Sequence, residues 1–349
     1  MDKIEISVIV CCYRGESTIK LCLESLIHQD YSKFKYEIII VNDGAIDNSL
    51  QIIKATIRNN SEDNLKITLI NKNNGGLSLA RNSGLNIARG DKIVYIDEDA
   101  VADKKFLKQI AYAFSENESI NCVGGAVELL NKDNSFASLL HYSIFSWYMR
   151  SSKAVIGTNM AFKKYFLDSI GGFIPEFTRR GDESALFAKA GNKLKILVNR
   201  KAIVYHMQPF EIKEWLRSRR ENGYYSAIIS KLIRKRATPL FYYIRTLFVF
   251  LHLVFIPTLF LISFFIPNMS SFLLSVYLIM LIKRYLYSNA IIGPVYLLKN
   301  TKVRNNKILE YLYLPVIIIL GCFYSDYGHI HATINLMKKN NYKNIRINQ

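Results

Sequence analysis

The stretch Tyr95-Ile96-Asp97-Glu98-Asp99 closes an apolar run with two aspartates one residue apart. Residues 92–96 are predicted to form a buried strand, because a continuous apolar run is typical of a parallel sheet covered on both faces. Ligands of open α/β sheets bind beyond the carboxyl ends of the strands. Asp97 and Asp99 are therefore candidate ligands for a hard cation such as Mg²⁺ or Mn²⁺. An ordinary acidic loop is the alternative, because the motif is short.

Three earlier apolar runs have the same organisation, each followed by polar residues and then by a helical pattern. Strands that alternate with helices in this way predict βαβ units and a parallel sheet. The polar residues that follow the strands should then line one edge of the sheet as a shared site. The four predicted strands are Ser7–Cys12, Tyr36–Val41, Leu65–Asn71 and Ile93–Ile96.

The pattern stays α/β as far as residue 206, although helices and strands no longer alternate strictly. Helices are predicted over 106–114 and 184–190. Strands are predicted over 121–130, 157–162 and 202–206. The strand at 157 begins with Gly157, and a glycine there lets the backbone pass close to a ligand.

The chain of 349 residues has room for one larger domain and a smaller unit. Its net charge is +18, but residues 201–349 contain 20 Lys and Arg against 5 Asp and Glu. This basic excess accompanies apolar segments, as expected where Lys and Arg flank membrane elements on the cytoplasmic side. The charge therefore favours a membrane surface over a nucleic acid as the partner.

The C-terminal part contains segments long enough to cross a bilayer. Residues 247–266 contain no Asp, Glu, Lys or Arg, and about 30 Å of hydrocarbon needs about 20 residues. A second crossing is predicted within 270–298, whereas 311–325 is short and is expected to be interfacial or re-entrant. Residues 211–233 have the spacing of a basic amphipathic helix on a membrane surface, with a solvated charged helix as the alternative.

Charge also predicts the topology. Basic clusters at 231–236, at 299–307 and in the tail after residue 338 should all be cytoplasmic, which permits two crossings. A third crossing would place the basic tail outside. The chain shows no secretory signal at its start, so we expect a multi-pass protein of the cell membrane with its first domain in the cytoplasm.

The five cysteines lack metal-ligand spacing, and with no export signal they are expected to be reduced. Cys11 and Cys12 are adjacent, and a redox pair is one interpretation. The other is that they continue an apolar strand and pack as small hydrophobes.

Four motifs, in this order and spacing, resemble the family 2 glycosyltransferases of GT-A fold. The resemblance covers about residues 4–210 and is best over 4–100. It implies a Rossmann-like mixed sheet with helices on both faces, followed by C-terminal transmembrane or interfacial helices. The implied parts are a GT-A domain at 1–209, an amphipathic linker helix at 210–238 and a membrane region at 239–349. The four motifs are Ser7–Tyr13, Val41–Asp47, Asn74–Gly84 and Asp97–Asp99.

The resemblance implies roles for residues on the donor side. Tyr13 and Glu16 would lie against the nucleotide base, and Asp43 would accept a hydrogen bond from a uracil-type N3–H. Arg81 would bind the diphosphate together with the backbone amides of Gly75 and Gly76. These residue types suit that task, because a guanidinium forks onto phosphate oxygens and glycines let amides approach an anion.

The metal and the base are implied in the same way. Asp97 would meet the ribose or the metal, Asp99 the metal, and His206 would complete the metal or diphosphate shell. A carboxylate must deprotonate the acceptor hydroxyl, and the family's acidic pair corresponds to Asp182 and Glu183. Glu183 falls at the base position, but the reversed order of the pair leaves open which carboxylate takes the proton.

Gly157 and Asn159 match the family's acceptor-side strand and would touch the donor sugar. The resemblance thus implies a membrane-anchored, metal-dependent, inverting glycosyltransferase that uses a nucleoside-diphosphate sugar, with uridine favoured. The expected acceptor is polyprenyl-linked or a growing glycan. Rival interpretations are a processive polysaccharide synthase, whose Gln-x-x-Arg-Trp signature does not occur here, a nucleotidyltransferase, and a non-catalytic membrane scaffold.

Overall fold

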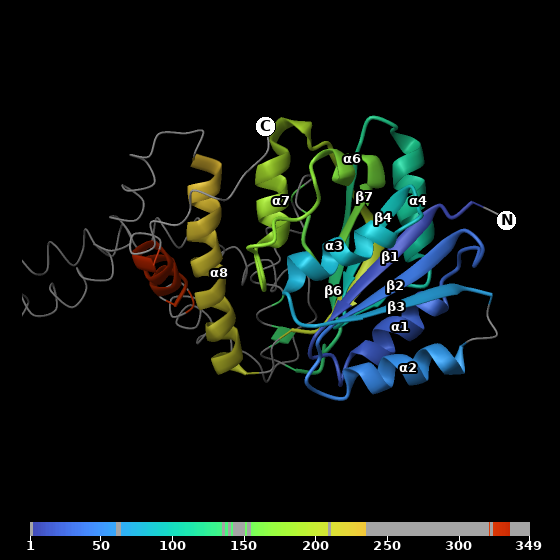
Figure 1. Ribbon diagram of the computed structural model, residues 1–349, viewed down its shortest axis with the longest axis horizontal. Coiled ribbons are helices and arrows are strands. Elements are labelled where there is room, and N and C mark those ends of the chain that lie inside the picture. Colours follow the sequence, from blue (N-terminus) through green and yellow to red (C-terminus); the bar gives the residue numbers. More distant parts are fainter. Residues whose placement is uncertain are drawn as a thin grey trace, which may run out of the picture. The chain divides into compact units, whose positions relative to one another are not determined.

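A computed structural model of the chain describes residues 3–60, 64–134, 137–138, 141, 151, 155–208, 211–234, 321 and 324–335 (Figure 1). The chain forms two compact units. The first contains Met1–Lys132 and Tyr148–Gln208, and the second contains Asp133–Trp147 and Pro209–Gln349.

The first unit is built on an eight-stranded mixed sheet in the order β3-β2-β1-β4-β7-β6-β8-β5. Strands β3, β2, β1 and β4 run parallel, as predicted, and β7 lies antiparallel between β4 and β6. Strand β8 is parallel to β6 and antiparallel to β5. The strands are β1 (Ile6–Cys12), β2 (Tyr36–Asp43), β3 (Lys66–Lys72), β4 (Lys92–Asp97), β5 (Ala100–Ala102), β6 (Cys122–Leu129), β7 (Asn159–Lys163) and β8 (Ile196–His206).

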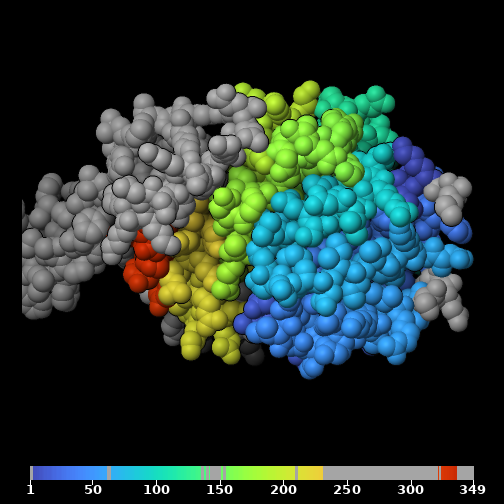
Figure 2. All heavy atoms as spheres, viewed as in Figure 1, coloured from blue at the N-terminus to red at the C-terminus, as the bar shows by residue number. Residues whose placement is uncertain are grey.

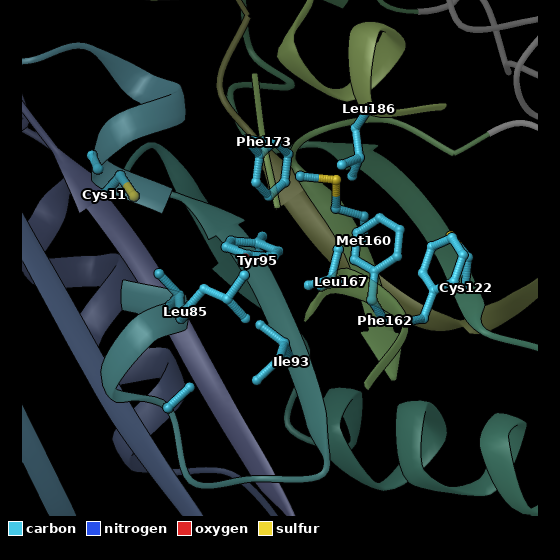
Figure 3. Packing of buried hydrophobic residues seen from close by; sticks show 14 of the residues in the cluster. Cys11, Leu85, Ile93, Tyr95, Cys122, Met160, Phe162, Leu167, Phe173 and Leu186 are labelled. Atoms are coloured by element: carbon cyan, nitrogen blue, oxygen red, sulfur yellow. The ribbon is translucent and has the colours of Figure 1, made fainter. Parts of the chain in front are cut away.

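Both faces of the sheet are covered, which explains why the central strands are mostly apolar on both faces. Successive side chains of a strand point to opposite faces. Ile9, Ile39 and Ile93 belong to a core cluster that includes Leu85 of α3, and Figure 3 shows Leu85 beside Ile93. Val8 and its alternate neighbours are equally buried on the other face. Burying such a side chain contributes about 1.5–3 kcal/mol.

The helices follow the predicted alternation. Helix α3 contacts β1 and β2, α4 contacts β6 and β8, and α1 and α2 contact each other (Figure 1). The helices of the first unit are α1 (Ile19–Ile27), α2 (Ser49–Asn59), α3 (Leu77–Ile87), α4 (Phe106–Glu116), α6 (Lys164–Ser169) and α7 (Asp182–Ala190), with a 3-10 turn η1 (Gly191–Lys193).

The strand register brings the functional candidates to one edge. Cys11 of β1 is paired with Val41 of β2 and with Asp97 of β4, so these parallel strands end together. Strand β8 ends at His206, whose register partner is Ala100, directly after Asp99. The carboxyl ends of the strands thus form one polar edge, as the sequence predicts.

In the second unit, α8 (Ile212–Arg234) packs against the helical residues 324–335. The backbones approach so closely that a Cβ on Gly223 would lie 1.7 Å from the carbonyl oxygen of Ser325. Trp215 and Ala227 are buried within the chain, so one face of this basic helix is already covered by protein.

The described helices include none that is both long and apolar enough to cross a membrane. The predicted spans 247–266 and 270–298, and most of the segment 311–325, lie outside the described residues.

Candidate active site

Asp97, Asp99 and His206 meet at the carboxyl edge of the sheet, where one ligand atom from each lies within 4.8 Å of the others. We call them the Asp–Asp–His cluster. His206 Nε2 is 3.1 Å from Asp99 Oδ1. Two carboxylates and one imidazole are a donor set that suits Mn²⁺ or Mg²⁺. The structure therefore brings together the three predicted metal ligands, and metal binding itself stays a prediction.

A contact to its second ring nitrogen orients the ring of His206. Its Nδ1 lies 3.1 Å from Gln208 Nε2, and a reciprocal pair of 3.0 Å hydrogen bonds joins the Asn131 side chain to the Gln208 backbone. Burial lowers the pKa of His206, but the charge of Asp99, its hydrogen bond and the charge of Asp97 together raise the pKa above its ordinary value. Such an outer partner fixes which ring nitrogen faces the cluster.

Asp97 has a partner on each carboxylate oxygen. Oδ1 accepts a hydrogen bond from Arg81 Nη2 at 3.0 Å, and Oδ2 accepts one from Thr158 Oγ1 at 2.8 Å. Thr158 was not predicted. It directly precedes β7, whose first residue, Asn159, is paired with Ile96, so only the antiparallel β4–β7 register reveals its position beside Asp97.

Arg81 lies buried at the centre of the site, with 2% of its surface exposed. Its guanidinium bonds Asp97 on one side and Asp182 on the other, and it also donates to the Gly157 carbonyl at 3.3 Å. Burial alone would lower the pKa of Arg81, but the two carboxylates raise it above its ordinary value, so the group stays charged.

The aromatic rings of Tyr95 and Phe173 complete the enclosure of Arg81. The guanidinium Cζ lies 5.7 Å from the centroid of the Tyr95 ring and 5.4 Å from the centroid of the Phe173 ring. Figure 3 shows these two rings next to each other, and they meet edge to face with their centroids 5.1 Å apart. The sequence predicts that Arg81 binds a diphosphate. In the structure its guanidinium joins the Asp–Asp–His cluster to the acidic pair that begins α7, and diphosphate binding stays a prediction.

The two acids of that pair differ in environment. Asp182 is 1% exposed and is the ion-pair partner of Arg81. Glu183 is half-buried, and a Cβ built on Gly157 would lie 3.6 Å from its Oε2. Burial, reinforced by the charge of Asp182, raises the pKa of Glu183 to about 7. A carboxyl group that titrates near neutral pH is suited to general-base chemistry.

Asp43 lies at the end of β2 and is anchored by the chain. It accepts hydrogen bonds from the amides of Gly75 and Gly76, at 2.9 and 2.8 Å, and from Lys72 Nζ at 2.6 Å. The two glycine amides were predicted to bind a diphosphate. In the structure the buried Asp43 carboxylate is their acceptor, and diphosphate binding at this loop stays a prediction.

The next amides of α3 also have acceptors within the chain. Leu77 N–H donates to the Thr178 carbonyl at 2.8 Å, and Ser78 N–H donates to the Phe177 carbonyl at 3.4 Å. Figure 2 shows the same neighbourhood at the surface, where the green spheres of the α7 region adjoin the cyan spheres of α3. The start of α3 is thus hydrogen-bonded to the segment that precedes α7, which lies far away in the sequence.

Tyr13 and Glu16 lie in the loop that follows β1. Tyr13 is half-buried, with Arg14 over its ring at 5.4 Å. The exposed Glu16 accepts a 2.7 Å hydrogen bond from Asn48 Nδ2, and its own amide donates to Asp47 Oδ2 at 3.3 Å. These contacts tie the loop after β1 to the loop after β2. The role of both residues in base binding stays a prediction.

Asn159 differs from its predicted place. Its side chain is 0% exposed and donates to the carbonyls of Ala126 and Ala202 at 2.9 and 3.0 Å. It therefore links β7 to backbone of the neighbouring strands and has no surface for a sugar. Gly157, in contrast, lies beside Arg81 and Glu183.

Glu98, between the two cluster aspartates, has no predicted role. Its Cγ lies 3.2 Å from where a Cβ on Gly15 would stand, so it packs under the loop after β1. Burial and the charges of Asp99 and Asp97 raise the pKa of Glu98 to about 8.

Burial also raises the pKa of Cys12 to about 12, and Cys11 is buried too, which favours the packing interpretation of this cysteine pair.

Residues 7–171 match the family model described as Glycosyl transferase family 2. The chain is 34% identical over 113 residues to the poly(ribitol-phosphate) beta-N-acetylglucosaminyltransferase TarS of Staphylococcus aureus, covering 32% of this chain and 19% of that protein. It is 33% identical over 132 residues to the glycosyltransferase GlyA of Streptococcus pneumoniae, covering 38% of this chain and 18% of that protein. The matched region thus spans about a fifth of these relatives.

Among solved structures, the chain is similar to the mannosyltransferase PcManGT from Pyrobaculum calidifontis, which is in complex with GDP-Man and Mn²⁺. The TM-score is 0.57 at 17% identity, covering 97% of this chain and 89% of that one. Similarity at this level supports the fold. Together with the sheet order it shows an α/β mixed sheet of GT-A type, and residues 7–171, slightly under half of the chain, are similar to glycosyl transferase family 2.

Proposed function

We propose that the chain is a metal-dependent, inverting glycosyltransferase. It moves a sugar from a nucleoside-diphosphate donor, with uridine favoured, to a polyprenyl-linked or growing glycan acceptor. One observation carries the proposal. The buried Arg81 bonds both Asp97 of the Asp–Asp–His cluster and Asp182, the neighbour of Glu183. A metal-ligand set and a candidate base are therefore parts of one site.

The groups on the two sides of Arg81 suit two parts of the reaction, departure of the diphosphate and deprotonation of the acceptor. A divalent cation held by Asp97, Asp99 and His206 would supply positive charge for a departing diphosphate. On the other side, the raised pKa of Glu183 suits removal of a proton from an acceptor hydroxyl. Asp182 is committed to the ion pair with Arg81, so we assign the proton to Glu183.

The proposed step is a single displacement. The acceptor hydroxyl gives its proton to a Glu183 carboxylate oxygen while its oxygen bonds the anomeric carbon of the donor sugar. The bond between that carbon and the diphosphate oxygen breaks, and its electron pair leaves with the diphosphate. Attack from the face opposite the leaving group inverts the anomeric configuration, and one base suffices.

The comparisons support the choice of substrates. TarS is named for transfer of N-acetylglucosamine to poly(ribitol phosphate), and the PcManGT structure contains a nucleoside-diphosphate sugar with Mn²⁺. We extend both features to this chain as a polymeric or lipid-linked acceptor and a nucleotide-sugar donor. The basic, apolar composition of residues 201–349 supports the membrane part of the proposal, with the site on the cytoplasmic face and no nucleic acid partner.

A donor panel tests the proposal. The full chain, purified in detergent, is incubated with UDP-, GDP-, CDP- and dTDP-sugars, with and without Mn²⁺, and release of the nucleoside diphosphate is measured. We expect release from one donor class that depends on Mn²⁺ and increases when a membrane lipid extract supplies acceptors. Absence of both donor binding and release across the panel would contradict the proposed function.

A further inference from the structure

We propose that Thr158 is a positioning residue for Asp97 and makes the Asp–Asp–His cluster select a small octahedral cation, Mn²⁺ or Mg²⁺, over Ca²⁺. The inference rests on the metal site of the proposed function and assigns its selectivity to a residue that is not itself a ligand. Thr158 Oγ1 donates a 2.8 Å hydrogen bond to Asp97 Oδ2. Threonine is common in strands, so the sequence alone does not single out Thr158.

A protein donor holds each oxygen of the Asp97 carboxylate. Arg81 Nη2 donates to Oδ1 at 3.0 Å, and Thr158 Oγ1 donates to Oδ2. Arg81 is itself fixed, because its guanidinium also bonds Asp182 and the Gly157 carbonyl. With both oxygens bonded to fixed donors, the plane of the Asp97 carboxylate keeps one orientation relative to the cluster.

Thr158 lies in a turn whose backbone is held at its end. The Asn159 N–H donates to the Ile156 carbonyl at 3.0 Å, which closes a four-residue turn with Gly157 and Thr158 at its centre. The buried side chain of Asn159 then attaches this turn to β6 and β8 through two hydrogen bonds to backbone carbonyls. The Thr158 hydroxyl is therefore presented to Asp97 by a rigid segment.

Metal selectivity depends on how freely the ligands adapt to the cation. Ca²⁺ takes six to eight ligands at about 2.3–2.6 Å and often binds both oxygens of one carboxylate, whereas Mg²⁺ requires a near-octahedral shell at about 2.0–2.1 Å. Mn²⁺ also takes an octahedral shell. In the cluster each residue offers one ligand atom. A fixed Asp97 carboxylate suits coordination through one oxygen, whereas a carboxylate that is free to rotate adapts to the larger shell of Ca²⁺.

The histidine of the cluster has an outer partner of the same kind. Gln208 Nε2 lies 3.1 Å from His206 Nδ1, while Nε2 of the ring faces Asp99. Outer partners fix the orientation of metal ligands, and their loss typically lowers metal affinity by about 10- to 100-fold. Thr158 holds Asp97 as Gln208 holds His206, so loss of its hydroxyl should have an effect within that range.

The test measures the affinity of the full chain for Mn²⁺ and for Ca²⁺ by calorimetry, in detergent, with and without UDP. Thr158→Val keeps the shape of the side chain and removes the hydroxyl. We expect its Mn²⁺ affinity to fall by about 10- to 100-fold and its Ca²⁺ affinity to fall less, so that the ratio of the two affinities decreases. Thr158→Ser keeps the hydroxyl and should retain the wild-type ratio.

Thr56→Val is the matched control. Thr56 lies in α2, which contributes no residue to the cluster, and its Oγ1 donates to the Ile52 carbonyl at 2.9 Å. The same chemical change is thus made outside the site, and the ratio of Mn²⁺ to Ca²⁺ affinity should stay at the wild-type value.

An unchanged ratio in folded Thr158→Val would overturn the inference while leaving the proposed function intact. A ratio lowered equally in Thr56→Val would also overturn it, because the effect would then not depend on Asp97. If wild type binds neither cation, the inference fails, and the donor panel decides separately whether the chain releases a nucleoside diphosphate from a sugar donor.

Discussion

The ends of β2 and β4 begin from the same sequence pattern, a buried strand that finishes in an acid, yet the two carboxylates have different surroundings. Asp43 receives two backbone amides and one ammonium group from its own chain. Asp99 faces His206 and lies beside Glu98 and Asp97. The chain thus fills most of the acceptor positions of the Asp43 carboxylate with amide and ammonium donors, whereas Asp99 has a titratable imidazole and two further carboxylates as its neighbours.

The same contrast recurs between two neighbours in α7. Asp182 is enclosed and paired with Arg81, whereas Glu183 has a pKa raised to about 7 by burial and by Asp182. Enclosed acids should therefore affect stability when changed, and available acids should affect transfer. Four predictions test this contrast.

Asp99→Ala should have the largest effect. Loss of a metal ligand should lower transfer by more than about 10³-fold, because metal charge stabilisation contributes several kcal/mol. The melting temperature should stay close to that of wild type. Transfer assays and Mn²⁺ titration calorimetry measure the effect, and Asp91→Ala, an exposed acid paired with Lys3, is a suitable control.

Glu183→Gln should lower transfer by about 10²- to 10⁴-fold, the usual range for loss of a general base. In wild type, kcat/KM should rise as the pH increases through about 7, since Glu183 must be deprotonated to act. The pH profile of the variant should lose this step. Normal transfer by folded Glu183→Gln at pH 7 would show that the base assignment is wrong.

Asp43→Ala should destabilise the fold by about 3 kcal/mol, because it leaves two buried amides and one ammonium group without their acceptor. Urea unfolding followed by circular dichroism measures the change. Equal free energies of unfolding for Asp43→Ala and Asp99→Ala would contradict the proposed difference between the two strand ends.

Glu183→Gln should also stabilise the protein slightly at high pH. Between pH 4.5 and about 7 the folded chain holds a proton that the unfolded chain has released, so folding stability falls as the pH rises through this window. Removing the charge should then raise the free energy of unfolding by about 1 to 2 kcal/mol at pH 8, with screening allowed for. No gain is expected at pH 4, and urea unfolding at both pH values tests this.

Much of the first half of the sheet was predictable, because its signal is local. The runs that form β1 to β4 are mostly apolar, and the predicted strands differ from the observed ones by one or two residues. Strand β5 was missed, since Ala100–Ala102 is too short to show a pattern and its pairing partner is β8. The first half of β8 was missed because its residues are only partly buried.

The site was predictable in its residue types but not in its pairings. The sequence identifies Asp97, Asp99 and His206, and the structure brings them together. The sequence does not reveal which carboxylates the Arg81 guanidinium and the Gly75 and Gly76 amides reach within the folded chain, and their binding of a diphosphate stays a prediction. Their observed partners, Asp182 and Asp43, come from distant segments and depend on burial that the tertiary fold creates.

The pairing of β5 with β8 has a consequence for folding. Asp99 directly precedes β5. Among the described residues, the sheet neighbour of β5 is β8, which is translated much later and ends at His206. Contacts between distant segments carry a loop-closure cost and tend to form late. A chain still emerging from the ribosome can complete β1 to β4 without yet possessing the Asp–Asp–His cluster. Binding of Mn²⁺ would then report the last stage of folding, and a nascent fragment ending at residue 171 should bind none.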